Sequence, residues 1–473
     1  MQRQDIEKSE YTYMLQSLCI LLYIHAYINS EITETFSEWY ASRPELNTLF
    51  TSLSNEYISY DANVVTAIDK YKRINGKVLS PKSILLYDHF PGCVNTHIPQ
   101  PFKDASPNFR DYDPVSPLSV DIPPVFGTGI PTEQGISVVM EYIHATYPQY
   151  KKVLWLNLRE EPVLYINNYP YVLRDIYDPY HNLIYTGINM KRLEEIEITL
   201  KNDIIMEMKA NNSTFCIYRE DDEANLVQNP IFTTRDNIHT PKEAYELYNS
   251  IHANSQDPSS LPAIIYRRIP VSDEQAPLIP ALSRYLKVLK DNLDCPTICN
   301  CQMGRGRTST AMIISVLSHV FYRNSWKSYT PLDTPQKEDF FNTPLSPIPS
   351  SVQNSEDEKY STYRFSVILS SLLSLLRNGR TVKGRIDRVI IECSKMQNIK
   401  DVIFVYFKLL TDPFCSVSKK DRYLVSVTHF FKRYIALLIL GGYFETHTPD
   451  TLESFEEWMV ASQPIQSLFD SIV

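Results

Sequence analysis

The segment that most constrains this chain is CQMGRGRTS at residues 301–309. Cys301 stands five residues before Arg307, and a hydroxyl residue, Thr308, follows. Gly304 and Gly306 let the backbone turn so that its N–H groups can bind a dianion at the start of a helix. The planar guanidinium of Arg307 can bind two phosphate oxygens. The positive field of this group and of the loop amides also favours a thiolate at Cys301. The other loop residues that we expect to contact the phosphate are Gln302, Met303 and Arg305.

The flanking sequence fits a loop of this kind. Residues 296–300 read as a short buried strand that enters the loop, and residues 311–321 read as a buried helix that leaves it. A chance loop and a rhodanese-type persulfide loop are the alternatives. The hydroxyl pair Thr308-Ser309 and the helix favour a phosphatase, in which either hydroxyl can donate a hydrogen bond to the thiolate.

Five blocks of sequence resemble the paladin family, whose members are related to the bacterial cysteine phytases with a tyrosine-phosphatase-like fold. They are DHFPGC at 88–93, GIPT at 129–132 with GI at 135–136, WLNLREEP at 155–162, RIPVSDEQAP at 268–277 and NCQMGRGRT at 300–308. The resemblance covers roughly residues 60–440. Asn300 stands where many cysteine phosphatases have a histidine, so the thiolate cannot be tuned by a histidine at that position.

The resemblance implies a fold and an activity. The fold is α/β, a protein-tyrosine-phosphatase-like three-layer fold with a central, mostly parallel sheet and helical terminal segments. The activity is that of a cysteine-dependent phosphatase that needs no metal or other cofactor and acts on inositol phosphates, phosphoinositides or phosphoprotein. Some relatives act mainly as regulators, which leaves a phosphate-binding scaffold with little turnover as an alternative.

Phosphate ester cleavage also needs an acid that protonates the leaving oxygen. The candidate is Asp273, which follows a predicted strand at 264–269 and, by resemblance, lies on the mobile general-acid loop. Glu274 is the second candidate, and a solvated acidic pair in a turn is the structural alternative. In the expected mechanism Cys301 attacks phosphorus, Asp273 protonates the leaving group, and Asp273 then acts as base when water hydrolyses the thiophosphate enzyme.

Arg305 bears on the choice of substrate. A basic side chain between the two loop glycines can touch a second phosphate beside the one being cleaved. Phosphotyrosine has no second phosphate, whereas inositol phosphates and phosphoinositide headgroups do. Arg268 and Arg284 could extend this basic wall. A protein tyrosine or dual-specificity phosphatase remains the alternative, in which Arg305 faces solvent.

Several other polar residues have two interpretations each. Arg159-Glu160-Glu161 follows a buried strand and either positions Arg307 or the substrate, or forms a structural ion pair. Cys295 and Cys299 are either resolving thiols for an oxidised Cys301 or small buried residues. His89 and Cys93 are expected to be structural.

Composition excludes some classes of function. The chain has 473 residues, 43% of them apolar, and a net charge of −9, which argues against nonspecific nucleic-acid binding. Its eight cysteines follow neither a disulfide nor a zinc pattern, so a reducing, cytoplasmic location is expected. The apolar run at 434–443 is shorter than the roughly 20 residues of a membrane span, and no transmembrane segment is predicted.

The two ends of the chain resemble each other. Phe36, Trp39, Leu49 and Phe50 recur at the same spacings as Phe455, Trp458, Leu468 and Phe469. Either both ends are amphipathic helical hairpins, or residues 1–58 are the tail of a preceding repeat unit, which a protein partner or a second copy would cover. The remaining predicted divisions are a phosphatase core at 59–325, a disordered insertion at 326–358 and a helical part at 359–473.

Local patterns predict further elements. Strands are expected at 83–87, 153–158 and 264–269, and helices at 135–147, at 190–210 and over much of the chain from 361. Residues 100–131 are rich in proline and are expected to cross the surface as irregular chain.

Overall fold

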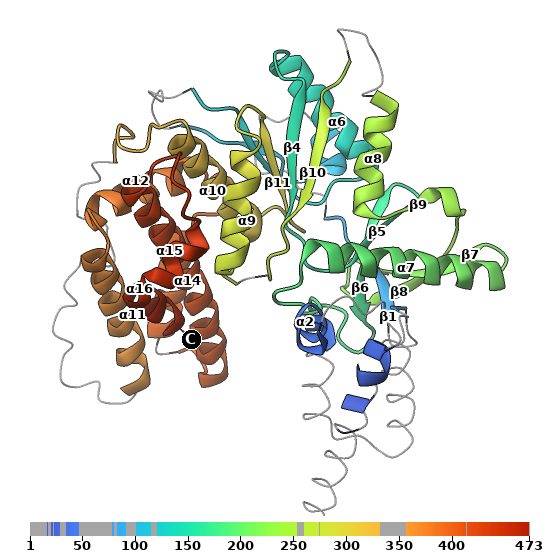
Figure 1. Cartoon of the computed structure of the whole chain (residues 1–473). Coiled ribbons are helices and arrows are strands. Elements are labelled where there is room, and N and C mark those ends of the chain that lie inside the picture. The colour runs from blue at the N-terminus through green and yellow to red at the C-terminus, as the bar shows by residue number, and fades with distance from the viewer. Residues whose placement is uncertain are drawn as a thin grey trace, which may run out of the picture. The chain divides into compact units, whose positions relative to one another are not determined.

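The structure is a computed structural model that describes residues 17, 20–21, 23–28, 35–46, 78–79, 83–90, 101–114, 121–252, 260–273, 275–331, 356–412 and 414–472. The predictions for Cys93, Glu274, Leu49, Phe50 and residues 332–355 lie outside the described residues. Two compact units interleave along the chain (Figure 1). The first contains residues 1–89, 130–138 and 159–260, and the second contains residues 90–129, 139–158 and 261–473.

The second unit is built on the predicted, mostly parallel sheet. Its strands, in order across the sheet, are β10 (Ala263–Arg268), β4 (Lys152–Asn157), β11 (Thr297–Asn300), β3 (Val125–Thr128) and β2 (Arg110–Asp111). All neighbours pair in parallel except β2, which is antiparallel to β3. The carboxyl end of β11 runs directly into the loop that begins at Cys301, as the sequence predicted.

The interpretation of residues 100–131 as irregular surface chain was wrong. This stretch forms α5 (Pro101–Ala105), β2 and β3, and the four residues of β3 are all buried. Because side chains alternate along a strand, Phe126 packs against Tyr142 of α6 (Glu133–Thr146) while Gly127 faces α10 (Gly306–Tyr322). Helices therefore cover both faces of the sheet and complete three layers.

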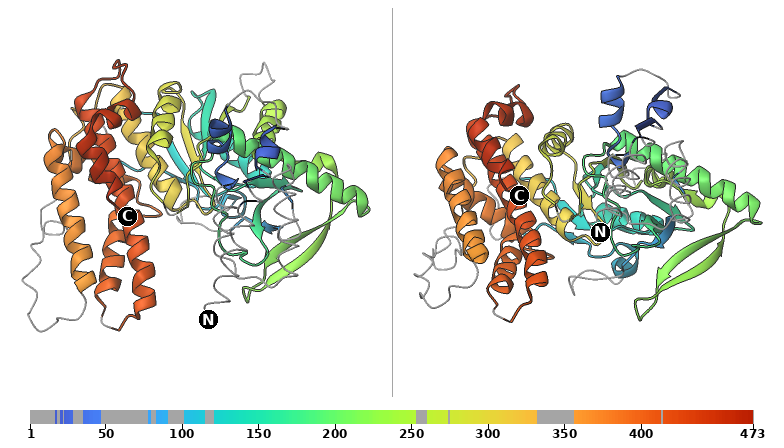
Figure 2. Two further views of the ribbon diagram at one scale, coloured as in Figure 1. Left: turned by 60° about the horizontal axis from the view of Figure 1, so that its bottom comes forward. Right: turned by 90° about the horizontal axis from the view of Figure 1, so that it is seen from below.

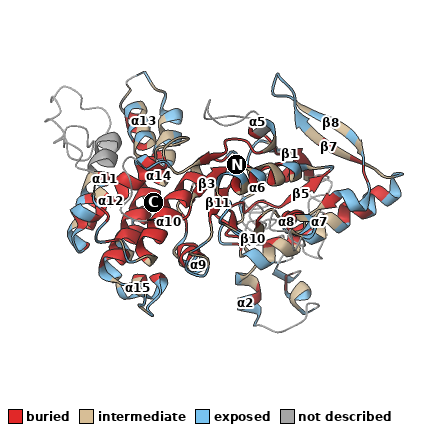
Figure 3. Ribbon diagram, turned by 90° about the horizontal axis from the view of Figure 1, so that it is seen from above, coloured by how far each residue is buried: buried red, intermediate tan, exposed pale blue. Residues whose placement is uncertain are grey.

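Residues 307–321 of α10 are all buried, and a group of helices packs with α10 into one core (Figure 3). They are α9 (Ile279–Lys290), α11 (Glu356–Leu375), α12 (Gly379–Glu392), α13 (Ile399–Thr411), α14 (Val417–Thr446), α15 (Phe455–Ala461) and α16 (Gln463–Asp470). Within the described part of the chain, α14 alone is long and apolar enough to cross a membrane. However, 72% of its most apolar window is buried, and the core helix of a soluble protein passes the same test.

The first unit contains a second sheet, of which only residues 83–87 were predicted. Its order is β8 (Leu226–Phe232), β7 (Thr214–Glu220), β1 (Ser83–Tyr87), β6 (Tyr169–Asp175), β5 (Val163–Ile166) and β9 (Ile238–His239). β7 and β8 form a long two-stranded ribbon (Figure 2). The helices α7 (Met190–Ala210) and α8 (Pro241–His252) belong to the same unit, and α7 has the bounds that the sequence predicted.

The segment predicted as a disordered insertion begins with ordered residues. Trp326 is 3% exposed and its indole N–H donates to Glu445 of α14 at 2.9 Å. Tyr329 is 1% exposed, and its hydroxyl donates to Glu392 of α12 at 2.6 Å. Residues 326–331 therefore belong to the packed second unit rather than to an insertion.

The resemblance between the chain ends extends to local structure. α2 (Phe36–Ala41) and α15 both begin with a capping box, in which a hydroxyl residue and a Glu three residues later bond to each other's backbone. In each helix the Phe and Trp rings stack, with centroids 5.9 Å apart in α2 and 6.0 Å apart in α15. Phe36 is 37% exposed, whereas Phe455 is 1% exposed.

Candidate active site

The loop at 301–307 has the conformation that its glycines predicted. Gly304 has a φ of +74°, and a Cβ on it would lie 2.5 Å from the backbone nitrogen of Gly129, so only glycine fits. α10 begins at Gly306, which sets the loop against the N-terminus of a buried helix. Cys301 is 4% exposed and directly follows the carboxyl end of β11, where the loop starts.

Hydrogen bonds from neighbouring elements fix the loop. The Asn108 side chain donates to the carbonyl of Met303 at 2.8 Å, and the Thr308 hydroxyl donates to the carbonyl of Thr128 at 3.3 Å. Asn300 accepts from the indole of Trp155 at 2.9 Å. Thr308 therefore holds the loop to β3 and does not donate to Cys301, contrary to the sequence-based expectation for this residue.

Asp273 lies beside Arg307. Their Oδ1 and Nε atoms are 3.2 Å apart, and Arg307 also donates from Nη1 to the carbonyl of Val271 at 3.2 Å. The Arg307 side chain is 1% exposed and that of Asp273 is 39% exposed. The arginine thus joins the loop of Asp273 to the phosphate loop, and the structure brings together the three residues that were predicted to be catalytic.

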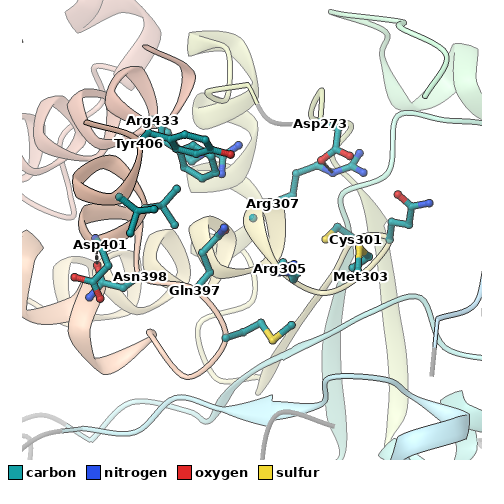
Figure 4. Close-up of a pocket in the computed structure, with 16 residues that line it drawn as sticks. Asp273, Cys301, Met303, Arg305, Arg307, Gln397, Asn398, Asp401, Tyr406 and Arg433 are labelled. Atoms are coloured by element: carbon teal, nitrogen blue, oxygen red, sulfur yellow. Dashed lines mark hydrogen bonds and ion pairs between the residues drawn. The ribbon is translucent and has the colours of Figure 1, made fainter. Parts of the chain in front are cut away.

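These residues line one cavity of about 530 Å³ within the second unit (Figure 4). The phosphate loop contributes Cys301, Gln302, Met303, Arg305, Gly306 and Arg307, and Asp273 joins them. The rest of the lining comes from the α12–α13 loop and from α13 and α14, namely Met396, Gln397, Asn398, Asp401, Val402, Val405, Tyr406, Phe430 and Arg433.

Among the basic residues, the structure separates Arg305 from the other two. Arg305 is exposed and lines the cavity. Arg268, which the sequence placed in the same basic wall, is 3% exposed and does not line it, because it ends β10 as one of the strand's buried positions. Arg284 does not line the cavity either, and partial burial lowers its pKa below the ordinary value of arginine.

Sequence reasoning missed Arg433, a buried cation on α14. It is 1% exposed, and its Nε and Nη2 donate to the carbonyl of Gln275 at 3.3 and 3.1 Å. Its Nη1 lies 3.0 Å from the position that a Cβ on Gly306 would occupy. Arg433 therefore ties the loop of Asp273 to α14 directly above the phosphate loop. The sequence feature that could have pointed to Arg433 is the presence of an arginine inside the apolar run 430–440.

Other sequence candidates have structural partners. In the first unit, Arg159 pairs with Asp88 at 2.8 Å and with Glu161 at 2.6 Å, and all three side chains are buried. The His89 ring is 3.1 Å from the carbonyl oxygen of Ile130. These contacts agree with the structural interpretation of both motifs.

The neighbouring thiols have the environment of packing residues. Burial raises the pKa of Cys299 to about 12, and its sulfur lies 3.8 Å from the hydroxyl of Ser315. Partial burial also raises the pKa of Cys295. Both remain protonated at neutral pH. The described residues contain no group of three or more His, Cys, Asp or Glu side chains that could hold a metal.

Comparison with known proteins finds a matching family model and several similar proteins. Residues 156–319 match the family model of the PTP-like phytases, whose description names inositol hexakisphosphate. The chain is 24% identical over 450 residues to paladin from Xenopus tropicalis and 24% identical over 452 residues to paladin from Gallus gallus. Each match covers 92% of this chain and 44% of the relative, so the chain spans about half the length of these relatives.

Among solved structures, a tandemly repeated PTP-like phytase from Mitsuokella multacida is similar to this chain with a TM-score of 0.45 and 14% identity. The match covers 82% of this chain and 49% of that protein.

Proposed function

We propose that the chain is a cysteine-dependent phosphatase acting on inositol phosphates or phosphoinositides, because residues 156–319 match the PTP-like phytase family model and the chain is similar to paladin over 92% of its length. The observation that carries the proposal is the convergence of Cys301, Arg307 and Asp273 on one cavity. These are a nucleophile, a phosphate-binding fork and an acid, the three groups that cleavage of a phosphate monoester requires.

In the first step the Cys301 thiolate attacks phosphorus in line with the ester oxygen. A sulfur–phosphorus bond forms while the phosphorus–oxygen bond breaks, and Asp273 gives its proton to the leaving oxygen. The loop amides, the helix N-terminus at Gly306 and the Arg307 fork stabilise the charge on the equatorial oxygens. The product of this step is a thiophosphate on Cys301.

In the second step water attacks the same phosphorus. Asp273, now a carboxylate, accepts a proton from that water, and the electron pair of the sulfur–phosphorus bond returns to Cys301 as a thiolate. Inorganic phosphate leaves, and the protonated Asp273 is ready for another cycle. Arg307 contacts Asp273 at 3.2 Å, so the acid loop and the phosphate loop are held at one site for both steps.

Charge and size support a substrate with more than one phosphate. Arg305 is exposed in the cavity beside the nucleophile, where it can bind a second phosphate. The volume of about 530 Å³ lies within the range of small-molecule sites. An inositol ring that carries several phosphates fits both properties.

One observation favours a second candidate, a protein tyrosine phosphatase. The side of the cavity opposite the phosphate loop presents Val402, Val405, Tyr406 and Phe430. Apolar and aromatic side chains can pack against the ring of a phosphotyrosine. In either case a reducing compartment is proposed, because Cys301 must remain a thiol, and the described cysteines are all unpaired.

The test is phosphate release by the purified chain from inositol hexakisphosphate, a panel of phosphoinositides, phosphotyrosine peptides and p-nitrophenyl phosphate. We expect turnover of inositol compounds that Cys301→Ser abolishes. Arg305→Ala should lower kcat/KM for multiply phosphorylated substrates about tenfold, in the range of one charge-assisted contact, and barely change that for p-nitrophenyl phosphate.

The matched control is Arg267→Ala, which removes an exposed arginine that does not line the cavity. Turnover of phosphopeptides alone would replace the inositol substrate by a protein. If no substrate is turned over while inositol hexakisphosphate still binds the Cys301→Ser variant, the chain is a phosphate-binding scaffold.

A further inference from the structure

Arg110 is a buried arginine behind the phosphate loop to which nothing above gives a function. It lies on β2 and is 0% exposed. Its Nη1 donates to the carbonyl of Asn108 at 3.1 Å, and its Nη2 donates to the hydroxyl of Ser309 on α10 at 2.9 Å. The guanidinium carbon is 3.0 Å from the position of a Cβ on Gly127, so the missing side chain of that glycine makes room for it.

No carboxylate pairs with this guanidinium within the described residues. Both hydrogen-bond acceptors are neutral oxygens, and Nε is buried with no hydrogen-bond partner in the same part of the chain. Burial lowers the pKa of Arg110 to about 10, which still leaves it a cation at neutral pH. Because a buried charge without a counterion is costly, an anion nearby is expected to compensate it.

The sheet register relates Arg110 to the strand that leads into Cys301. Gly127 of β3 stands opposite Arg110 of β2 on one side and opposite Cys299 of β11 on the other. Cys301 follows two residues after Cys299 and therefore continues the same face toward the phosphate loop. Cys301, Cys393 and Cys299 are the thiols near enough to Arg110 to favour its cation.

Of these three thiols, only Cys301 lies in the phosphate loop. Burial raises the pKa of Cys299 to about 12 and raises that of Cys393 still further. Cys301 instead begins the loop at the start of α10, where backbone amides and the helix dipole favour an anion.

Several charged or titratable groups face Cys301 from the elements around it. Some are neutral, and the cations among them differ in whether a carboxylate lies nearby. The groups are Arg110 from β2, Tyr285 from α9, Cys299 from β11, Arg305 and Arg307 from the loop, and Asp273 through its contact with Arg307; Asp401 from α13 and Arg433 from α14 line the same cavity. Tyr285 is a neutral phenol, since burial raises its pKa. Arg307 has a carboxylate 3.2 Å away.

We propose that Arg110 is a positioning residue that stabilises the thiolate of Cys301 from inside the protein. It supplies the positive charge at the buried side of the nucleophile, while Arg307 and the loop amides bind the phosphate at the open side. A fixed buried cation would thus stabilise the thiolate in a chain where Asn300 replaces the histidine that precedes the nucleophile in many cysteine phosphatases. The inference rests on the proposed function only in naming Cys301 as the nucleophile.

The test measures the thiolate without any substrate. The wild-type chain and its variants are alkylated with iodoacetamide across a range of pH, and modification of the peptide that contains Cys301 is followed by mass spectrometry. Arg110→Gln retains hydrogen-bonding capacity but removes the charge. We expect it to raise the pH midpoint of Cys301 alkylation by about one unit, the size of effect that a nearby opposite charge has on an ionisable group.

Two further variants separate charge from packing. Arg110→Lys keeps the charge, so its pH midpoint of Cys301 alkylation should lie close to that of the wild-type chain. Ser309→Ala removes the partner of Nη2, so it should raise the midpoint by a smaller amount and provides the test if Arg110→Gln does not fold. Arg267→Gln, at an exposed arginine, should change nothing.

Two results would overturn the inference. One is an unchanged midpoint in a folded Arg110→Gln protein or, where that variant does not fold, in Ser309→Ala. The other is an equal shift in Arg110→Gln and Arg110→Lys, which would assign Arg110 a packing role. Because alkylation needs no turnover, failure of the proposed phosphatase activity would not affect the measurement.

Discussion

The two sides of the cavity are built in different ways (Figure 4). One side, the loop wall, is the contiguous segment 301–307, whose backbone turns at Gly304 and points toward the start of α10. The other, the helical wall, is assembled from the α12–α13 loop and from α13 and α14, and its lining consists of side chains at 396–398, 401–402, 405–406, 430 and 433.

This difference suggests a division of roles, in which the loop wall carries out phosphate cleavage and the helical wall selects the substrate. In the loop wall, backbone geometry provides much of the phosphate site, and a Cβ at Gly304 would clash with the backbone of β3 and the residue after it. In the helical wall, apolar side chains lie beside Asp401 and Arg433, and exchanging them alters the shape and charge of the site without moving the nucleophile. Variants in the loop wall should therefore affect all substrates, with the exception of Arg305, whose exposed side chain is proposed to bind a second phosphate, and most variants in the helical wall should discriminate between substrates.

The largest effect is expected from Arg307→Ala in the loop wall. The change removes the phosphate fork and the contact to Asp273 at 3.2 Å. We expect kcat/KM to fall by about 10³-fold for every substrate, the upper range for loss of one transition-state donor. Arg323→Ala, which changes an arginine just beyond the end of α10, is the control. A large loss with only one class of substrate would contradict the division between the walls.

A smaller, leaving-group-dependent effect is expected from Asp273→Asn. Loss of the general acid should slow hydrolysis of alkyl and inositol phosphates by about 10²-fold, because their leaving groups need a proton. The effect on kcat/KM for p-nitrophenyl phosphate, which reports the first step alone, should be much smaller, since its leaving group departs without one; kcat for this substrate should fall because the second step has lost its base. Equal losses on both kinds of substrate would remove Asp273 from the role of acid.

Arg433→Met tests the point at which the helical wall reaches the acid loop. The variant loses the donors to the Gln275 carbonyl and should loosen the loop of Asp273. We expect about a tenfold loss for poor leaving groups, an order of magnitude below the full effect of a general acid. Arg433→Lys should recover part of it. In the Asp273→Asn background the change should add little, because both act through one group; full additivity would show that Arg433 acts separately.

Glu445→Gln should alter the stability of the helical wall and leave kcat/KM unchanged at 25 °C. Burial alone would disfavour the Glu445 carboxylate, but hydrogen bonds from Asn378 and Trp326 and the charge of Arg385 lower its pKa overall. Removing this partner should cost about 3 kcal/mol of unfolding free energy at neutral pH.

The pH dependence of that loss follows from the sign of the shift. A carboxyl with a lowered folded-state pKa stabilises the protein above its ordinary pKa, and this contribution disappears as the pH falls through the folded value. The difference in unfolding free energy between wild type and Glu445→Gln should therefore be full at pH 7 and shrink below pH 4.5. A constant difference across that range would show that the charge of Glu445 does not contribute.

The contrast between the walls also explains which features the sequence could predict. The phosphate loop was recognisable because its chemistry is local, with nucleophile, glycines and arginine in one short segment. Arg433 and Gln397 are brought to the site by packing of α12, α13 and α14, so no spacing in the sequence indicates their place. β3 was missed because four buried residues follow a pair of prolines, and the expectation for Arg268 failed because its position in β10 is buried.

The central claim is that phosphate passes through Cys301, and trapping the intermediate tests it most directly. Asp273→Asn protein, which retains the nucleophile but lacks the base for the second step, is mixed with p-nitrophenyl phosphate, quenched in acid and mapped by mass spectrometry. We predict phosphate on the peptide that contains Cys301, and none when Cys301→Ser is added. Phosphate release with no label on Cys301, or with the label on another residue, would contradict the account.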